Sequence, residues 1–187
     1  MISRGLWESA RDLQMFLDSC AYSFCFIGGI AYQRWGEPRV TSDLDVTVIV
    51  SFGEEKPVLQ NLLRRYQPRI PDPVRFALQS RVLLLQDIAG HGIDLSLGGM
   101  PFEERVVQRS TLWGIPGSGN IRTCSAEDLV VMKAFASRPQ DWIDVEKVVI
   151  RQGNRLNRDL ILDELRPLVE LKEEPEILDQ LTRIFSG

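Results

Sequence analysis

The 187-residue chain has a single histidine and only three cysteines, which limits the chemistry that it can support. Because His91 is the only histidine, a zinc site of several histidines or a two-histidine iron site is excluded. His91 itself lies in a turn-like Ala-Gly-His-Gly segment. A Ser-His-Asp triad would have to recruit this one turn residue, which argues against that mechanism. Cys20, Cys25 and Cys124 are odd in number and contain no C-x-x-C pair, so we expect reduced thiols and a cytoplasmic protein.

The sequence also lacks an excess of positive charge and a long apolar run. The formal net charge is −4, so no global positive field marks the chain as a dedicated nucleic-acid-binding protein. No apolar run approaches the roughly 20 residues of a membrane-spanning helix, and the N-terminus lacks a signal-peptide core. We therefore expect a globular protein without a membrane partner.

Three aspartates are the most informative residues that are present. Asp43 and Asp45 open a Val-, Thr- and Ile-rich segment that is typical of a strand, and Asp94 lies in a second such segment. Alternate side chains of a strand project to one face, so Asp43 and Asp45 point together. If the two strands are neighbours, three carboxylates converge where a hard divalent cation would bind.

The identity of the third carboxylate has one alternative. Residues 81–86 and 92–97 flank a Gly-rich turn and predict a β-hairpin, with Asp87 at one end and Asp94 at the other. Asp94 lies on the polar face of its strand, between apolar neighbours, so strand parity favours Asp94 over Asp87.

The remaining pattern predicts an α+β fold, with a mixed β-sheet flanked by helices over residues 1–123 and a helical C-terminal region over 124–187 packed on this core. Further short strands are expected over residues 23–27 and 120–124, and proline- or glycine-rich connections over 68–73 and 113–120. Ser125 matches the N-cap of a capping box. Helices are expected over residues 8–22, 30–35, 57–65, 102–108, 126–137, 140–150, 157–171 and 176–185.

Gly28 and Gly29 lie between a predicted strand and a predicted helix. A turn without side chains lets backbone N–H groups approach a phosphate, and a helix N-terminus adds a favourable dipole. A Gly pair is also common in tight turns and close packing, so its meaning depends on the aspartates that follow.

The order strand, Gly28-Gly29, helix, loop, Asp43-x-Asp45 resembles the nucleotidyltransferase superfamily that shares the DNA polymerase β-type core. The resemblance implies the fold of that superfamily and the transfer of NMP from an NTP, ATP among them, to a hydroxyl acceptor. It also implies that Asp43, Asp45 and Asp94 hold two Mg²⁺ or Mn²⁺ ions as catalytic carboxylates, and that Gly28 and Gly29 contact the nucleotide. Unlike many members, this chain has Gly29 where a serine often follows the first glycine.

A second segment, Lys133 to Asp144, resembles the Lys…Arg-x-x-Asp-x-x-Asp segment of AbiEii-type nucleotidyltransferases, which include toxins of toxin–antitoxin systems. The resemblance implies catalytic roles for Lys133 and Asp141, and nucleotide binding by Lys133 and Asp144. It also implies a cognate antitoxin as a partner and RNA or tRNA, a protein or a small molecule as the acceptor. The alternative is a structural ion pair in which Lys133 and the two aspartates join two helices.

For several other basic and polar residues the sequence allows two interpretations, one functional and one structural. Arg39 and Thr41 precede the aspartate pair and are assigned to nucleotide binding, with a solvated loop as the alternative. The stretch from residue 64 to residue 81 contains five arginines and only one acidic residue: Arg64, Arg65, Arg69, Arg75 and Arg81, with Asp72. These arginines would line an acceptor groove for nucleic acid, or alternatively form a solvated surface. For the whole chain, a catalytically silent binding module of the same fold is the alternative to the enzyme.

Overall fold

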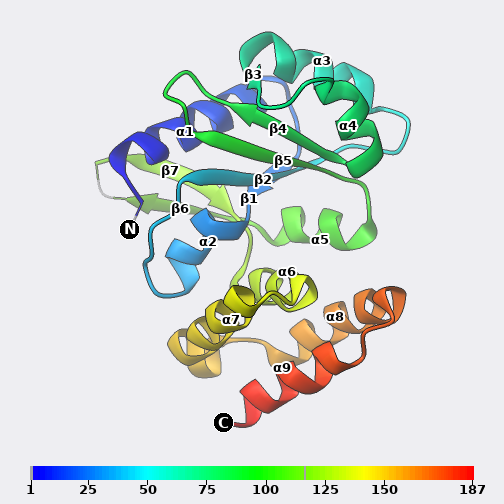
Figure 1. Ribbon diagram of the computed structural model, residues 1–187. Helices are drawn as coiled ribbons and strands as arrows, with labels where there is room; N and C mark the ends of the chain where they lie inside the picture. The colour runs from blue at the N-terminus through cyan, green and yellow to red at the C-terminus, as the bar shows by residue number, and fades with distance from the viewer. Residues whose placement is uncertain (1, 116) are drawn as a thin grey trace.

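In a computed structural model that describes residues 2–115 and 117–187, the chain forms one mixed seven-stranded sheet with helices on both faces (Figure 1). The strand order is β3-β4-β5-β2-β1-β7-β6. Strand β2 pairs in parallel with β5, and β1 pairs in parallel with β7, whereas the other neighbours are antiparallel. The strands are β1 (Phe24–Phe26), β2 (Asp43–Ile49), β3 (Gln67–Pro68), β4 (Val82–Gln86), β5 (Gly92–Gly98), β6 (Thr111–Ile115) and β7 (Gly119–Thr123).

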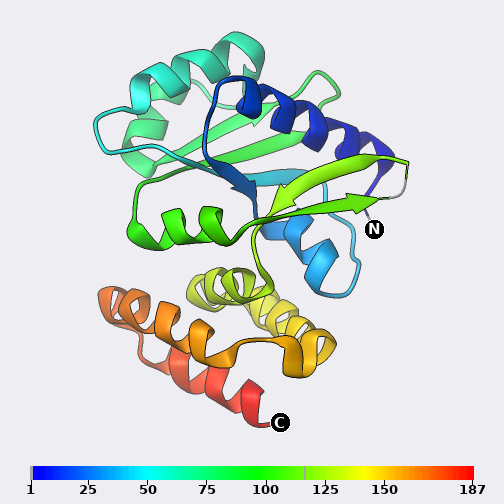
Figure 2. The ribbon, with the colours of Figure 1, turned by 180° about the vertical axis from the view of Figure 1, so that it is seen from behind.

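The helices form two layers around the sheet and a further layer at the C-terminal end (Figures 1 and 2). Helices α1, α3 and α4 cover one face, and α2 and α5 lie on the other, next to the helical layer α6–α9. Among the described helices, none combines the length and the apolar character needed to cross a bilayer. The helices are α1 (Arg4–Ser19), α2 (Gly28–Trp35), α3 (Glu55–Arg65), α4 (Pro73–Ser80), α5 (Pro101–Arg109), α6 (Ala126–Ala136), α7 (Pro139–Gln152), α8 (Arg158–Lys172) and α9 (Glu176–Ser186).

The alternation of β2 separates the apolar core from the candidate site. Leu44, Val46 and Val48 are buried in a core that they share with α1 and α3. Side chains at the intervening positions therefore face the other side of the sheet, toward α2, α5 and the C-terminal helices. Asp43 and Asp45 are on this side, as the expected strand parity requires.

A second apolar core holds the C-terminal helices against this face. It contains residues from α6 to α9 together with Tyr32 of α2 and Val106 of α5. Ion pairs reinforce the junction, because Arg109 of α5 contacts Asp128 of α6 at 2.5 Å and Glu164 of α8 at 2.7 Å. Burial and paired charges together fix α6 and α8 relative to the sheet.

The α+β class with a helical C-terminal region is confirmed, as are the hairpin of β4 and β5 and the Ser125 cap, whose hydroxyl accepts the Asp128 N–H at 3.0 Å. The expected connection over residues 113–120 is wrong, because β6 and β7 form a hairpin there; Pro116, within that stretch, lies outside the described residues. Residues 67–68 join the sheet edge as β3. Helix α4 was not expected and begins at Pro73, where proline suits the first helical position.

Candidate functional site

Asp45 and Asp94 lie directly opposite each other in the parallel pair β2–β5. Partners in a parallel ladder project to the same face of the sheet, so both carboxylates lie on the side of α2 and the C-terminal helices. Asp43 shares this face and is paired with Gly92, where a Cβ would overlap the Asp43 carboxylate. The absence of a side chain at Gly92 therefore leaves room for the Asp43 carboxylate.

The environment of Asp45 disfavours its charged form. Burial raises the pKa of Asp45, and the negative charges of Asp94 and Asp43 raise it further, while the Gly29 N–H and Lys133 oppose this shift. The Gly29 N–H donates to Asp45 Oδ2 at 3.1 Å. Three carboxylates that crowd one another in this way suit a bound cation, which would relieve their repulsion.

Both glycines allow the N-terminus of α2 to approach β2 closely. Gly28 has φ +52°, in the left-handed region, and a Cβ there would overlap the Asp45 carboxylate. A Cβ at Gly29 would overlap Thr41 Oγ1, so the Thr41 hydroxyl fills the space that a serine side chain would need. The Gly29 amide, expected to contact a phosphate, is instead engaged by Asp45 in this structure.

The carboxylate of Asp94 is ion-paired with Arg69, which follows β3. Within residues 2–115 and 117–187, no three His, Cys, Asp or Glu side chains form a group that could hold a metal ion as they stand. The donor chemistry of Asp43, Asp45 and Asp94 fits Mg²⁺, but Asp94 must exchange Arg69 for the ion. Asp87, the alternative third carboxylate, instead accepts the His91 N–H at 2.8 Å in the hairpin turn.

Lys133 lies between the two aspartates of α7. Its Nζ is 2.9 Å from Asp141 Oδ1 and 2.7 Å from Asp144 Oδ2, and its side chain is 8% exposed. Burial would raise the pKa of Asp144, but hydrogen bonds and charge from Lys133, together with Gln140 and Arg39, hold it below its ordinary value. The ion pair that joins α6 and α7 is therefore present, and its Lys133 also acts electrostatically on Asp45.

Arg39 connects this ion pair to the loop before β2. Its Nη2 is 3.0 Å from Asp144 Oδ2, and its guanidinium lies 5.2 Å from the ring centre of Tyr32. Arg39 Nε and Asp141 Oδ2 are both buried without a hydrogen-bond partner in the described part of the chain. Unpaired buried polar atoms are rare in proteins, so these two are candidates for contacts with a ligand.

The structure brings Asp43, Asp45 and Asp94 together on one sheet face and gathers Arg39, Lys133, Asp141 and Asp144 in one ion-paired group. Two further residues, Arg69 and Tyr32, belong to the neighbourhood but were not assigned to it from the sequence. The sequence marked Arg69 only as one of five clustered arginines, and nothing in the sequence around Tyr32 indicated a position near the site.

The arginine-rich stretch does not form one free basic surface. Arg65 is paired with Asp12 at 2.6 Å, Arg81 with Glu55 at 2.7 Å, and Arg69 with Asp94. Three of the five guanidinium groups are therefore already neutralised by acids, which weakens the interpretation as a nucleic-acid groove.

Comparisons with known proteins identify the family and the fold of the chain. A family model described as "Nucleotidyl transferase AbiEii toxin, Type IV TA system" matches residues 14–183. No curated protein is similar enough to the chain to count as a relative.

Two solved structures share the fold at 14% identity. One is an antigenic nucleotidyltransferase-like protein from Paracoccidioides brasiliensis, with a TM-score of 0.53 over 95% of this chain and 92% of that chain. The other is the antibiotic-resistance factor ANT(2'')-Ia in solution, with a TM-score of 0.59 over 92% of this chain and 95% of that chain. The family match spans nearly the whole sequence, and the chain therefore belongs to the AbiEii family of nucleotidyltransferases.

Proposed function

We propose that the protein transfers NMP from an NTP to a hydroxyl acceptor in a reaction that depends on Mg²⁺. The observation that carries the proposal is the position of Asp45 directly opposite Asp94, with Asp43 on the same face, against the N-terminus of α2. Oxygen ligands on adjacent strands suit hard cations, and phosphoryl transfer needs its developing charge neutralised in place.

Asp43, Asp45 and Asp94 would hold the metal. When bound, Mg²⁺ supplies charge neutralisation at the α-phosphate and makes a hydroxyl a better nucleophile. The raised pKa of Asp45 fits this role, because a group crowded by like charges gains most from a nearby cation. Asp94 becomes available once its carboxylate leaves Arg69.

Cationic and polar groups around the carboxylates would bind the triphosphate. Lys133 supplies a buried ammonium, and Asp141 and Asp144 hold it in position. Arg39 Nε is a buried donor without a partner in the described residues, and Thr41 supplies a hydroxyl close to where a serine at residue 29 would lie. These groups orient the phosphates for an in-line reaction.

The reaction exchanges a phosphoanhydride bond of the NTP for a phosphodiester bond to the acceptor. The acceptor oxygen forms a bond to the α-phosphorus while the bond from that phosphorus to the bridging oxygen breaks, and pyrophosphate leaves. The Asp94 carboxylate takes the proton of the acceptor hydroxyl, a role that suits a carboxylate on the same face as the reacting phosphate. No covalent enzyme intermediate is required.

Label transfer tests the proposal. Purified protein is incubated with Mg²⁺, each α-labelled NTP in turn and three acceptor classes, namely total cellular RNA, cell protein and small-molecule extracts. We expect labelled product from the wild type and from Asp87→Asn, which changes a carboxylate away from the site. Label that persists undiminished in Asp45→Asn would overturn the assignment of the carboxylates.

One observation favours a second candidate, a binding module without turnover. The Arg69 guanidinium already neutralises the Asp94 carboxylate, so this side of the site is stable without a metal ion. Nucleotide binding without label transfer to any acceptor class supports that alternative.

The family description suggests a toxin with a cognate antitoxin as its partner. Growth arrest on induction in bacterial cells tests that role. It should disappear in Asp45→Asn if transfer causes it, and arrest that persists in this variant would separate toxicity from the proposed chemistry.

A further inference from the structure

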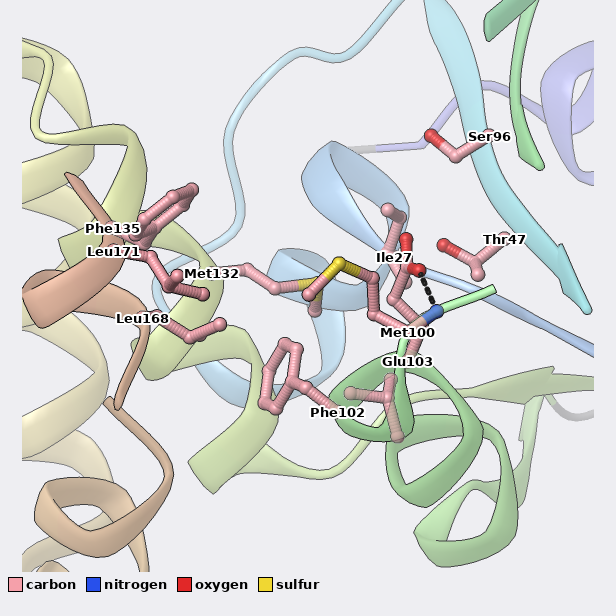
Figure 3. A pocket seen from close by; sticks show the side chains of 11 residues that line it. Ile27, Thr47, Ser96, Met100, Phe102, Glu103, Met132, Phe135, Leu168 and Leu171 are labelled. Carbon is pink, nitrogen blue, oxygen red and sulfur yellow. Dashed lines mark hydrogen bonds between the residues drawn. The ribbon is translucent and has the colours of Figure 1, made fainter. Parts of the chain in front are cut away.

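A cavity of about 400 Å³ lies between the sheet and the helical layer, on the same face as the aspartates (Figure 3). This volume falls in the range of small-molecule sites, roughly 300–1,000 Å³. Figure 3 shows side chains from α5, α6 and α8 lining it opposite Thr47 and Ser96 of the sheet. The apolar wall comprises Met100, Phe102, Met132, Phe135, Leu168 and Leu171.

The cavity lies beside the candidate site, further along strands β2 and β5. Thr47 and Ser96 form the register pair that follows Asp45 and Asp94 by two residues on the same face. Two residues of a strand span about 7 Å, so the floor of the cavity begins within the reach of a small molecule from the carboxylates. Met132 adds a further link, because it precedes Lys133 on α6 and lines the cavity.

The cavity wall carries little charge for a charged ligand to pair with. Its described lining residues include no lysine, arginine or histidine, and the single acid is Glu103. Glu103 Oε2 accepts the Gly99 and Met100 N–H groups at 2.8 and 2.9 Å, so its charge is held at the N-terminus of α5. The cavity therefore suits neither a polyanion nor a polycation.

Two hydroxyl groups on the cavity floor are available to a ligand. Thr47 and Ser96 both line the cavity, and Figure 3 shows their side chains directed from the sheet toward it. An apolar wall with a few convergent polar groups is the usual form of a site that orients an amphipathic small molecule. Here the polar end is the end nearest Asp45 and Asp94.

We infer that this cavity is the acceptor subsite and that the acceptor is an uncharged small molecule with an apolar body and a hydroxyl group. The inference rests on the proposed nucleotidyl transfer and names its substrate class. The apolar body packs against α5, α6 and α8, Thr47 and Ser96 orient the polar end, and the hydroxyl reaches the α-phosphate beside Asp45 and Asp94. An RNA acceptor finds no cation in this cavity for its phosphates.

Three acceptor classes test the inference in parallel, each with labelled NTP and Mg²⁺. The probes are 4-phenyl-1-butanol and a steroid alcohol as uncharged acceptors, kanamycin as a polycation, and total tRNA as a polyanion. Leu168→Trp fills the cavity from α8, and Glu170→Trp is the matched control on the exposed face of the same helix. Ser96→Ala removes a floor hydroxyl with little risk to folding.

We expect label on at least one uncharged alcohol, a loss of about tenfold or more in Leu168→Trp and no change in Glu170→Trp. Ser96→Ala should raise KM for the alcohol. Nucleotide Kd should be unchanged in all three variants, which shows that they fold and keep the nucleotide site.

The inference is overturned if neither alcohol acquires label, or if Leu168→Trp labels the alcohols as well as the wild type does. Label that appears only on tRNA or kanamycin overturns the acceptor subsite and leaves nucleotidyl transfer intact. Absence of both nucleotide binding and label on every acceptor overturns the subsite and the proposed function together.

Discussion

Arg69 forms an ion pair with Asp94, the residue that faces Asp45 across strands β5 and β2. A guanidinium therefore competes for the carboxylate that would complete the metal site. We predict that Arg69→Met tightens the binding of Mn²⁺ by up to about fivefold, because a partly exposed ion pair contributes at most about 1 kcal/mol. Isothermal titration calorimetry measures the change.

Arg75→Met is the matched control for this prediction, since it removes an exposed arginine of α4 that contacts none of the three carboxylates. Equal Mn²⁺ affinity in the wild type and Arg69→Met would show that the ion pair does not restrain the site.

Asp45→Asn should stabilise the protein at neutral pH while abolishing transfer. The pKa of Asp45 is raised by burial and by Asp94 and Asp43, so its ionised form costs folding free energy above that pKa. The asparagine oxygen still accepts the Gly29 N–H, and we expect a gain of about 1 kcal/mol in the free energy of unfolding. Urea denaturation at several pH values measures it.

The stability gain expected from Asp45→Asn should depend on pH, because it arises from the charge of Asp45. The gain from Asp45→Asn should shrink as the pH falls through the raised folded pKa, where Asp45 is neutral in the wild type as well. Asp87→Asn should behave oppositely. Burial would raise the pKa of Asp87, but hydrogen bonds from Ser9 and His91 lower it, so its removal costs stability at neutral pH. Destabilisation by Asp45→Asn would contradict the account.

Gly28→Ala and Gly53→Ala separate backbone strain from overlap with the site. Both glycines have positive φ, +52° and +92°, so the backbone strain of an alanine costs about 1 kcal/mol in stability at either position. A Cβ at Gly53 meets open space, whereas one at Gly28 overlaps Asp45. Only Gly28→Ala should lose activity, by about tenfold or more. Similar transfer rates in both variants would remove the close approach of α2 from the mechanism.

Lys133→Met should destabilise the protein by about 3–5 kcal/mol, because Asp141 loses its close cation in a buried setting and Asp144 keeps only Arg39. The loss applies at neutral pH and declines as the pH falls through the lowered pKa of Asp144, below its ordinary 3.8. Lys147→Met, which removes a half-exposed lysine paired with Glu37, should cost less than about 1 kcal/mol. Equal losses in chemical denaturation would mean that the Lys133 pair is not buried in solution.

Local sequence patterns were sufficient for much of the core. The alternation that starts at Asp43 predicted both the strand and the face of its aspartates, and Ser125 predicted the start of α6. The parity of Asp94 predicted the face of the sheet on which it lies, whereas the pairing of β2 with β5, which sets Asp94 opposite Asp45, was only a condition of that prediction. Its role as a metal ligand stays a prediction.

Features that depend on distant partners were not predictable in this way. Strand β6 was not expected, because its second half falls in the stretch assigned to a connection; its pairing with β7, the strand expected over residues 120–124, stabilises it. The pairs Arg39–Asp144 and Arg69–Asp94 join residues far apart in sequence, so no local pattern indicates them.

A Mn²⁺ titration followed by electron paramagnetic resonance, with a non-hydrolysable NTP analogue present, tests the central claim that Asp45 and Asp94 form one metal site. The account predicts about two bound Mn²⁺ per wild-type chain and an affinity reduced at least about tenfold in Asp45→Asn and in Asp94→Asn. Asp87→Asn should match the wild type. Undiminished Mn²⁺ binding in Asp45→Asn and Asp94→Asn would contradict the account.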